Sequence, residues 1–185
     1  MKRFVLPILL ALISLPLAAC GGADAKQSAD ELSHLLEVND KLSFSAQLQT
    51  EYPDRCYDFT VDYEREGGEA SVTVVYPEQI AGISARVIGG AAELEYDGLR
   101  LDVGELDEYG LTPMSALPVL VDTMQNGHLD GWWEEDGKIV LLLTADDHIS
   151  ATVWLEAATV TPMRAELVSD ALVVVYCDIS DWKAY

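Results

Sequence analysis

Apolar and polar residues alternate with a period of two along most of the chain after residue 41. In the first such stretch, Leu42, Phe44, Ala46 and Leu48 alternate with serine and glutamine. Strands of this kind bury one face and expose the other to water, as strands of antiparallel sheets do. The pattern predicts strands at Leu42–Gln49, Tyr57–Glu64, Ala70–Tyr76, Ser84–Ile88, Ala92–Tyr96, Leu99–Val103, Gly131–Glu135, Lys138–Thr144, Ile149–Leu155, Met163–Leu167 and Leu172–Ile179. Ile139–Leu143 and Leu172–Val175 are continuous apolar runs, as in strands covered on both faces.

Two stretches have helical spacing instead. Leu32, Leu35 and Leu36 share one face of a short helix predicted at Asp30–Val38. A second helix is predicted from Pro113 to Asn126, with Thr112 as its N-cap. The alternative is a later start or a kink at Pro118, which lies in the first turn and a half. The apolar stripe of this second helix consists of Leu117, Leu120, Val121 and Met124.

The order of elements is helix, several strands, helix, several strands. A sheet with this many strands is too wide to stay flat, so it must curl or close. We therefore predict an α+β fold in which a strongly curved antiparallel β-sheet holds the helices in its concave side.

The first 20 residues have the character of a cleavable signal. Lys2 and Arg3 precede an uncharged apolar run from Phe4 to Leu17, which is short for a membrane span. Leu17-Ala18-Ala19-Cys20 resembles the lipobox of bacterial lipoproteins. That resemblance implies cleavage before Cys20 and acylation of its thiol, and two or three acyl chains would anchor the chain stably on the extracytoplasmic face of the cell membrane. The alternative is an ordinary secreted protein with a chance cysteine at the cleavage site.

These patterns predict three parts of the chain. Residues 1–19 are the signal peptide, residues 20–29 are the lipidated cysteine and a flexible tether of small and polar residues, and residues 30–185 are one domain. Removal of residues 1–19 takes away two basic residues and no acid, so the formal charge of −21 becomes −23. A chain this acidic lacks the Lys and Arg stripes that phosphate groups need, so we expect no nucleic-acid partner.

Cys56 and Cys177 remain as a pair if Cys20 carries lipid. In a compartment that permits oxidation, an even number of cysteines is compatible with a disulfide. The alternative is that both are buried free thiols that act as small hydrophobic side chains. Sequence alone leaves the two interpretations open, because it does not place the two Cα atoms.

Two local patterns and the order of elements resemble the lipoprotein carrier (LolA-like) family. The first pattern is Asp30–Leu48, a short helix that leads straight into a strand. The second is Ala151–Leu167, where Trp154, Leu155 and Pro162 match the family's hairpin and Glu156 replaces its usual Asp. The stretch from residue 95 to residue 120 also resembles uncharacterised lipoproteins of Gram-positive gut bacteria.

The family resemblance implies an unclosed half-barrel with two or three helices over an apolar cavity. Carrier members hold acyl chains there, other members are membrane-anchored lipoproteins, and one relative in spore formers is the protein partner of a cell-wall amidase. The carriers' functional cavity arginine has no match here, because no motif aligns Arg86 or Arg100 with it. We expect a lipid or another apolar ligand in the cavity, or alternatively a scaffold that binds a protein partner of the cell envelope.

The side chains expected at such a cavity are aromatic residues and methionines. Adjacent Trp132 and Trp133 place one ring on each face of a strand, so one ring is core and the other lies at the rim or at the cavity mouth. Residues of the second helix form either a movable apolar lid or plain core, and they are Met114, Leu117, Val121 and Met124.

No arrangement of residues points to catalysis. Asp146-Asp147-His148 has the spacing of a turn, and the acidic run from Asp102 to Glu108 lacks the pattern of an EF-hand loop. No Gly-x-Ser-x-Gly motif occurs, and the remaining histidines, His34 and His128, lie in a predicted helix and a turn. We therefore expect no enzyme, no metal site and no cofactor.

Overall fold

A single curved antiparallel sheet carries the fold. The computed structural model describes residues 21–52, 55–105, 112–170 and 172–185. The sheet has eleven strands in the order β6-β5-β4-β3-β2-β1-β11-β10-β9-β8-β7. The strands are β1 (Lys41–Tyr52), β2 (Arg55–Glu66), β3 (Glu69–Tyr76), β4 (Ser84–Ile88), β5 (Ala91–Tyr96), β6 (Leu99–Glu105), β7 (His128–Glu135), β8 (Lys138–Thr144), β9 (Ile149–Glu156), β10 (Thr161–Ser169) and β11 (Leu172–Ala184).

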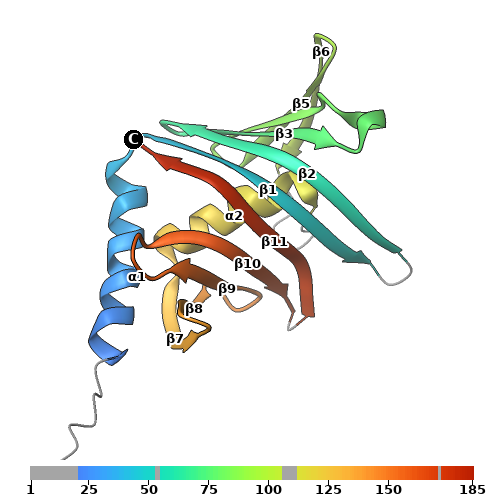
Figure 1. Cartoon of the computed structure of the whole chain (residues 1–185). Coiled ribbons are helices and arrows are strands. Elements are labelled where there is room, and N and C mark those ends of the chain that lie inside the picture. The colour runs from blue at the N-terminus through green and yellow to red at the C-terminus, as the bar shows by residue number, and fades with distance from the viewer. Residues whose placement is uncertain (1–20, 53–54, 106–111, 171) are drawn as a thin grey trace, which may run out of the picture.

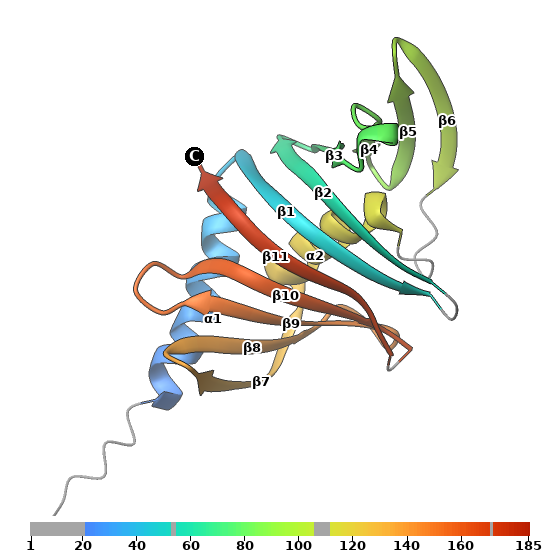
Figure 2. The ribbon, with the colours of Figure 1, turned by 45° about the vertical axis from the view of Figure 1, so that its right-hand side comes forward.

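Each strand pairs with the next one in sequence except β6 with β7, and the first and last strands, β1 and β11, meet at the centre of the sheet. The two end strands, β6 and β7, do not pair with each other, so the curved sheet stays open. Helices α1 (Gly21–Val38) and α2 (Pro113–Asn126) lie against one face, which we call the concave face (Figures 1 and 2). A short 3₁₀ turn, Glu78–Ile80, follows β3. The predicted α+β class and unclosed half-barrel are thus confirmed.

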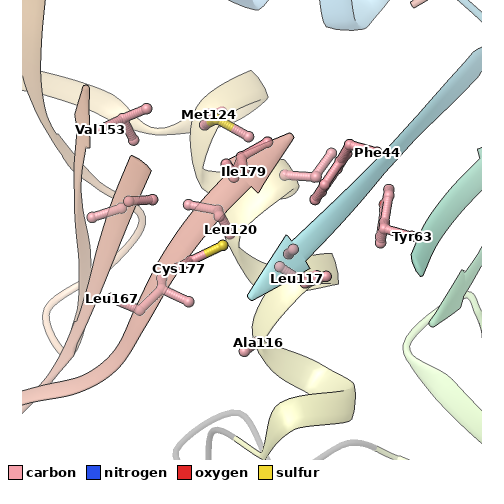
Figure 3. Packing of buried hydrophobic residues seen from close by; sticks show 14 of the residues in the cluster. Phe44, Tyr63, Ala116, Leu117, Leu120, Met124, Val153, Leu167, Cys177 and Ile179 are labelled. Carbon is pink, nitrogen blue, oxygen red and sulfur yellow. The ribbon is translucent and has the colours of Figure 1, made fainter. Parts of the chain in front are cut away.

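Strand alternation decides which side chains reach the concave face. Leu48 of β1 lies opposite Phe59 of β2 and Cys177 of β11, and this row points toward the helices. Helix α2 packs onto the same face from the other side with Leu117, Leu120 and Met124 (Figure 3). These three residues and Val121 are almost fully buried. Burial of these apolar surfaces is the main favourable contribution to folding, at about 25 cal/mol per Å².

Helix α2 begins where the sequence predicts. Thr112 has extended backbone angles, and its hydroxyl accepts a hydrogen bond from the Ser115 N–H at 3.2 Å. The Ser115 hydroxyl in turn accepts from the Thr112 N–H at 2.8 Å. This reciprocal pair satisfies two of the N–H groups that the start of a helix leaves without partners.

The predicted flexible tether at residues 20–29 is wrong for residues 21–29, which belong to α1. Ala25 and Ser28 are buried, and with Leu32 and Leu36 they form one stripe at helical spacing. The two glycines and polar residues of Gly21–Ala29 suggested a coil, but the packing of α1 beside β7 and β8 overrides that weak local preference. Residues 1–20, including the predicted signal peptide and Cys20, lie outside the described residues.

Cys56 and Cys177 are both free. Cys177 is buried on the concave face, whereas Cys56 is exposed on strand β2 and points to the opposite, convex face. Because a sheet separates them, they do not form the disulfide that the sequence left open. Burial raises the pKa of the Cys177 thiol well above its ordinary value.

Among the described residues, no helix is both long and apolar enough to cross a membrane.

The packing of α1 can be tested at its first buried residue. Ala25→Asp places a carboxylate against the sheet without a partner, so we expect a loss of about 2 kcal/mol, or roughly 4–8 °C in Tm for a chain of this size. Gln27→Asp puts the same charge on the exposed side of the same helix and should change Tm by less than about 1–2 °C. Equal Tm values for the two variants would show that this part of the chain does not pack.

Candidate functional site

A groove with a volume of about 1030 Å³ runs along α2. One wall is the side of α2 that carries Pro118, Val119, Asp122 and Gln125. The opposite wall is the concave face of three strands, with Tyr63, Arg65, Ala70 and Val87. The glycine turns Gly67-Gly68 and Gly89-Gly90 form one rim, and the start of β9 with the preceding turn forms the other.

Arg65 holds the helices beside this groove. It is the last concave-facing residue of β2, and its guanidinium donates to the Gln125 side-chain oxygen at 2.8 Å. It also donates to the backbone carbonyl of Leu36 at 2.6 Å. Leu36 lies in the last turn of α1, where carbonyls lack helical partners and the helix dipole favours a cation. One arginine therefore fastens β2, the end of α1 and the end of α2 together.

Arg65 is the functional-site residue that sequence reasoning missed. The two arginines considered there, Arg86 and Arg100, lie on the convex face. Arg86 pairs with Glu69 at 2.6 Å, and Arg100 lies 3.2 Å from Glu95. The sequence signal for Arg65 was its place in the alternation of β2, where it falls in the row of apolar residues that faces the core. A charged side chain in such a row needs hydrogen-bond partners.

Tyr63 lines the groove next to Arg65. Its ring stacks on Phe44 with centroids 4.8 Å apart, and Phe44 stacks on Trp182 at 5.1 Å. Burial raises the pKa of Tyr63 to about 12, and of the smaller contributions Arg65 lowers it and Asp122 raises it. The stack forms a flat apolar floor of the concave face.

Beyond the groove, the concave face continues onto strands without close cover. Val87 in the groove lies opposite Ala92 on β5, and Leu94 is the next concave residue of that strand. Leu94 lies opposite Leu101 of β6, which is 62% exposed, and Leu99 is 76% exposed. Tyr96 shares this face. We call Leu94, Tyr96, Leu99 and Leu101 the open apolar face.

The predicted lid residues belong mostly to the core. Leu117, Val121 and Met124 are buried between α2 and the sheet, and Met114 packs half-buried against the same core. Of these four, Val121 also lines the groove. Whether this helix moves as a lid stays a prediction.

The two tryptophans of β7 point to opposite faces, as predicted. Trp132 packs against the core, but Trp133 lies on the convex face and so does not line the concave groove. The indole N–H groups of Trp133 and Trp154 both donate to the same Glu135 carboxylate oxygen, at 3.3 and 3.1 Å, and these bonds lower the pKa of Glu135. The Arg164 guanidinium lies 5.1 Å from the centre of the Trp154 ring.

The acidic turn before β9 is stabilised by local bonds. Asp146 accepts the backbone N–H groups of His148 and Ile149 at 2.7 and 2.8 Å, and these bonds lower its pKa. His148 pairs with Asp170 at 2.8 Å, which raises the pKa of His148. No group of three or more metal-ligating side chains occurs in the part of the chain that the structure describes. Asp107 and Glu108 of the acidic run lie outside it.

Comparison with solved structures identifies the fold. The chain is similar to a LolA superfamily protein from Nitrosomonas europaea, with a TM-score of 0.53, 14% identity, and coverage of 87% of this chain and 93% of that one. It is also similar to a domain of a proposed outer-membrane lipoprotein-sorting protein from Vibrio parahaemolyticus, with a TM-score of 0.52, 10% identity, and coverage of 86% and 93%. No protein-family model and no curated protein matches the sequence. The chain therefore has a LolA-like fold.

Replacement of Arg65 tests whether its hydrogen bonds hold the two helices against β2. Arg65→Met keeps an unbranched, uncharged stem but leaves the carbonyl of Leu36 and the side-chain oxygen of Gln125 without their donor, so we expect a loss of about 1–3 kcal/mol in urea unfolding. Arg65→Lys should recover only part of this loss, because an ammonium does not reproduce the fork of donors. Arg86→Met breaks only a surface ion pair and should cost less than about 1 kcal/mol; an equal effect of the Arg65 and Arg86 variants would contradict the assignment.

The raised pKa of Tyr63 predicts a pH dependence. The folded state disfavours the phenolate, so this contribution to stability is complete below pH 10, the ordinary pKa, and is lost as pH rises toward about 12. Between pH 9 and pH 11 the free energy of unfolding should fall by about 1 kcal/mol more in the wild type than in Tyr63→Phe. Tyr96→Phe removes an exposed phenol and should keep the wild-type slope; a Tyr63→Phe variant with that same slope would refute the effect.

Proposed function

We propose that this chain is a lipoprotein, anchored through Cys20 to the extracytoplasmic face of the cell membrane, that binds an acyl chain or another apolar ligand on its concave face without catalysing a reaction. The observation that carries the proposal is the open apolar face, which adjoins the groove along α2. A soluble protein that leaves such a surface uncovered usually uses it for binding.

The dimensions and chemistry of the groove fit an apolar ligand. Its volume of about 1030 Å³ lies just above the range of roughly 300–1,000 Å³ that is typical of small-molecule sites in proteins. Both walls contribute apolar side chains, such as Val87 and Val119, and the α2 wall adds the polar groups of Asp122 and Gln125. An amphiphile with its chain on Leu94 and its polar end near α2 would satisfy both kinds of surface.

The proposal of a non-catalytic role rests on the surroundings of the titratable side chains. His148 pairs with Asp170 and His128 lies 3.8 Å from Asp130, both at the surface. Neither histidine lines the groove along α2, although the turn that carries His148 contributes Asp146 and Ile149 to its rim. The LolA-like fold adds support, because one structure that shares it belongs to a domain described as sorting lipoproteins, which are themselves acylated.

Ligand binding can be tested on residues 21–185, which contain every described helix and strand. We expect native mass spectra of this protein, purified without detergent, to show extra mass that organic solvent extracts. After extraction, the neutral probe N-phenyl-1-naphthylamine should bind with increased fluorescence. Val87→Asp in the groove and Leu94→Asp on the open apolar face should each weaken probe binding by about tenfold or more, because each introduces a charge that must be desolvated.

Thr73→Asp is the matched control, since it adds the same charge on the convex face of β3 and should leave the probe affinity unchanged. Circular dichroism would verify that all three variants fold. A wild type that carries no lipid and binds no probe would overturn the proposal and favour the alternative, a scaffold for a protein partner of the envelope.

A further inference from the structure

Strand β6 ends the sheet, and its outer edge has no partner strand among the described residues. Leu99 and Leu101 on its concave face are among the most exposed large apolar residues of the chain, at 76% and 62%. Edge strands with exposed apolar residues tend to pair with another strand. The question is which strand would fit this edge.

The hairpin between β5 and β6 determines which backbone groups face outward. Asp97 and Gly98 both have positive φ, 50° and 76°, and form a two-residue turn between the paired residues Tyr96 and Leu99. In such hairpins the residues that flank the turn bond to each other, and the bonding pairs recur at every second residue. The backbone groups of Leu99 and Leu101 therefore face β5, whereas those of Arg100 and Asp102 face the free edge.

A strand that pairs antiparallel with its own copy does so around a twofold axis. The backbone N–H and C=O groups of Arg100 and Asp102 face the free edge. They can form hydrogen bonds with the same groups of the second copy if the axis passes through residue 100, 101 or 102. An axis through Arg100 or Asp102 places like charges opposite each other. An axis through Leu101 places Arg100 opposite Asp102 in both directions and keeps the leucines together on one face.

We propose that β6 binds β6 of a second copy of this chain, antiparallel and centred on Leu101, so that the two sheets join edge to edge. The twofold axis is perpendicular to the sheet, so the open apolar faces of both copies lie on the same side. They then form one continuous apolar surface around the two Leu101 side chains.

The charges on the convex side of the hairpin favour this pairing. Asp102 lies directly opposite Glu93 on β5, and like charges in this position are destabilising. Arg100 already lies 3.2 Å from Glu95 and 3.7 Å from Glu93, so one guanidinium serves several carboxylates. In the pair, Arg100 of the second copy would bring a cation beside each Asp102.

Cysteine cross-linking of the full chain in intact cells tests the register. Residues at the axis face each other with Cβ atoms about 4.5–5.5 Å apart, close to disulfide geometry. In a Cys56→Ser background, Leu101→Cys should form a covalent dimer under mild oxidation, seen on a non-reducing gel. Leu99→Cys is the matched control, because its two copies would lie roughly 13 Å apart along the strands. We expect about tenfold more dimer from Leu101→Cys.

Charge exchange provides the second test and uses the same Leu101→Cys cross-link as its readout. Combined with Leu101→Cys, both Arg100→Asp and Asp102→Arg alone should abolish the cross-link, because each places like charges opposite each other. Co-expression of the two variants should restore it as a mixed dimer, since each Asp then faces an Arg. Equal cross-linking of Leu99→Cys and Leu101→Cys, no cross-linking at all, or no recovery in the mixture would overturn the proposal.

Discussion

The structure depends on how the concave face of one wide sheet is covered. Helix α2 has 14 residues and is about 21 Å long, so it spans only part of an eleven-stranded sheet. Under α2, the row that includes Leu120 and Met124 excludes water and forms the core. Beside it the surfaces separate into the groove, and beyond the groove Tyr96 of β5 and Leu99 and Leu101 of β6 stay exposed. The core, the groove and the open apolar face therefore all follow from the fact that α2 covers only part of the concave face.

Arg65 shows how this arrangement is kept in place. The guanidinium of Arg65 on β2 donates hydrogen bonds to residues of both helices, Leu36 of α1 and Gln125 of α2. Ser33 adds a direct link between the helices, because its hydroxyl donates to the carbonyl of Gln125 at 2.7 Å. The carbonyl groups of Leu36 and Gln125 lie in the last turns of their helices, where carbonyls lack helical partners. The hydrogen bonds that satisfy these carbonyls therefore also hold the two helices in place.

The sequence allowed the class of fold, the eleven strands and the N-cap of α2 to be predicted, because each follows from local alternation or capping chemistry. It did not reveal the first half of α1, since Ala25 and Ser28 are helical through contacts with β7 and β8 that are distant in sequence. The strand pattern placed Trp132 and Trp133 on opposite faces, but it did not show that Trp133 would lie on the convex face. Arg65 was overlooked because its partners, Leu36 and Gln125, belong to elements that only the folded chain brings together. Cys56 and Cys177 needed the sheet itself to show that they lie on different faces.

The helical start of the chain changes how the domain would sit on a membrane. Helix α1 begins at Gly21, the residue after the proposed lipid attachment, and is about 27 Å long. A coil at this place would let the domain rotate freely relative to its anchor. A helix packed along β7 and β8 instead couples the orientation of the sheet to that of the anchored end. Any tilt that the lipid imposes at the first turn would be shared by the whole sheet. The anchored domain would then have a restricted set of orientations relative to the membrane. Its apolar surface would meet other molecules only in those orientations.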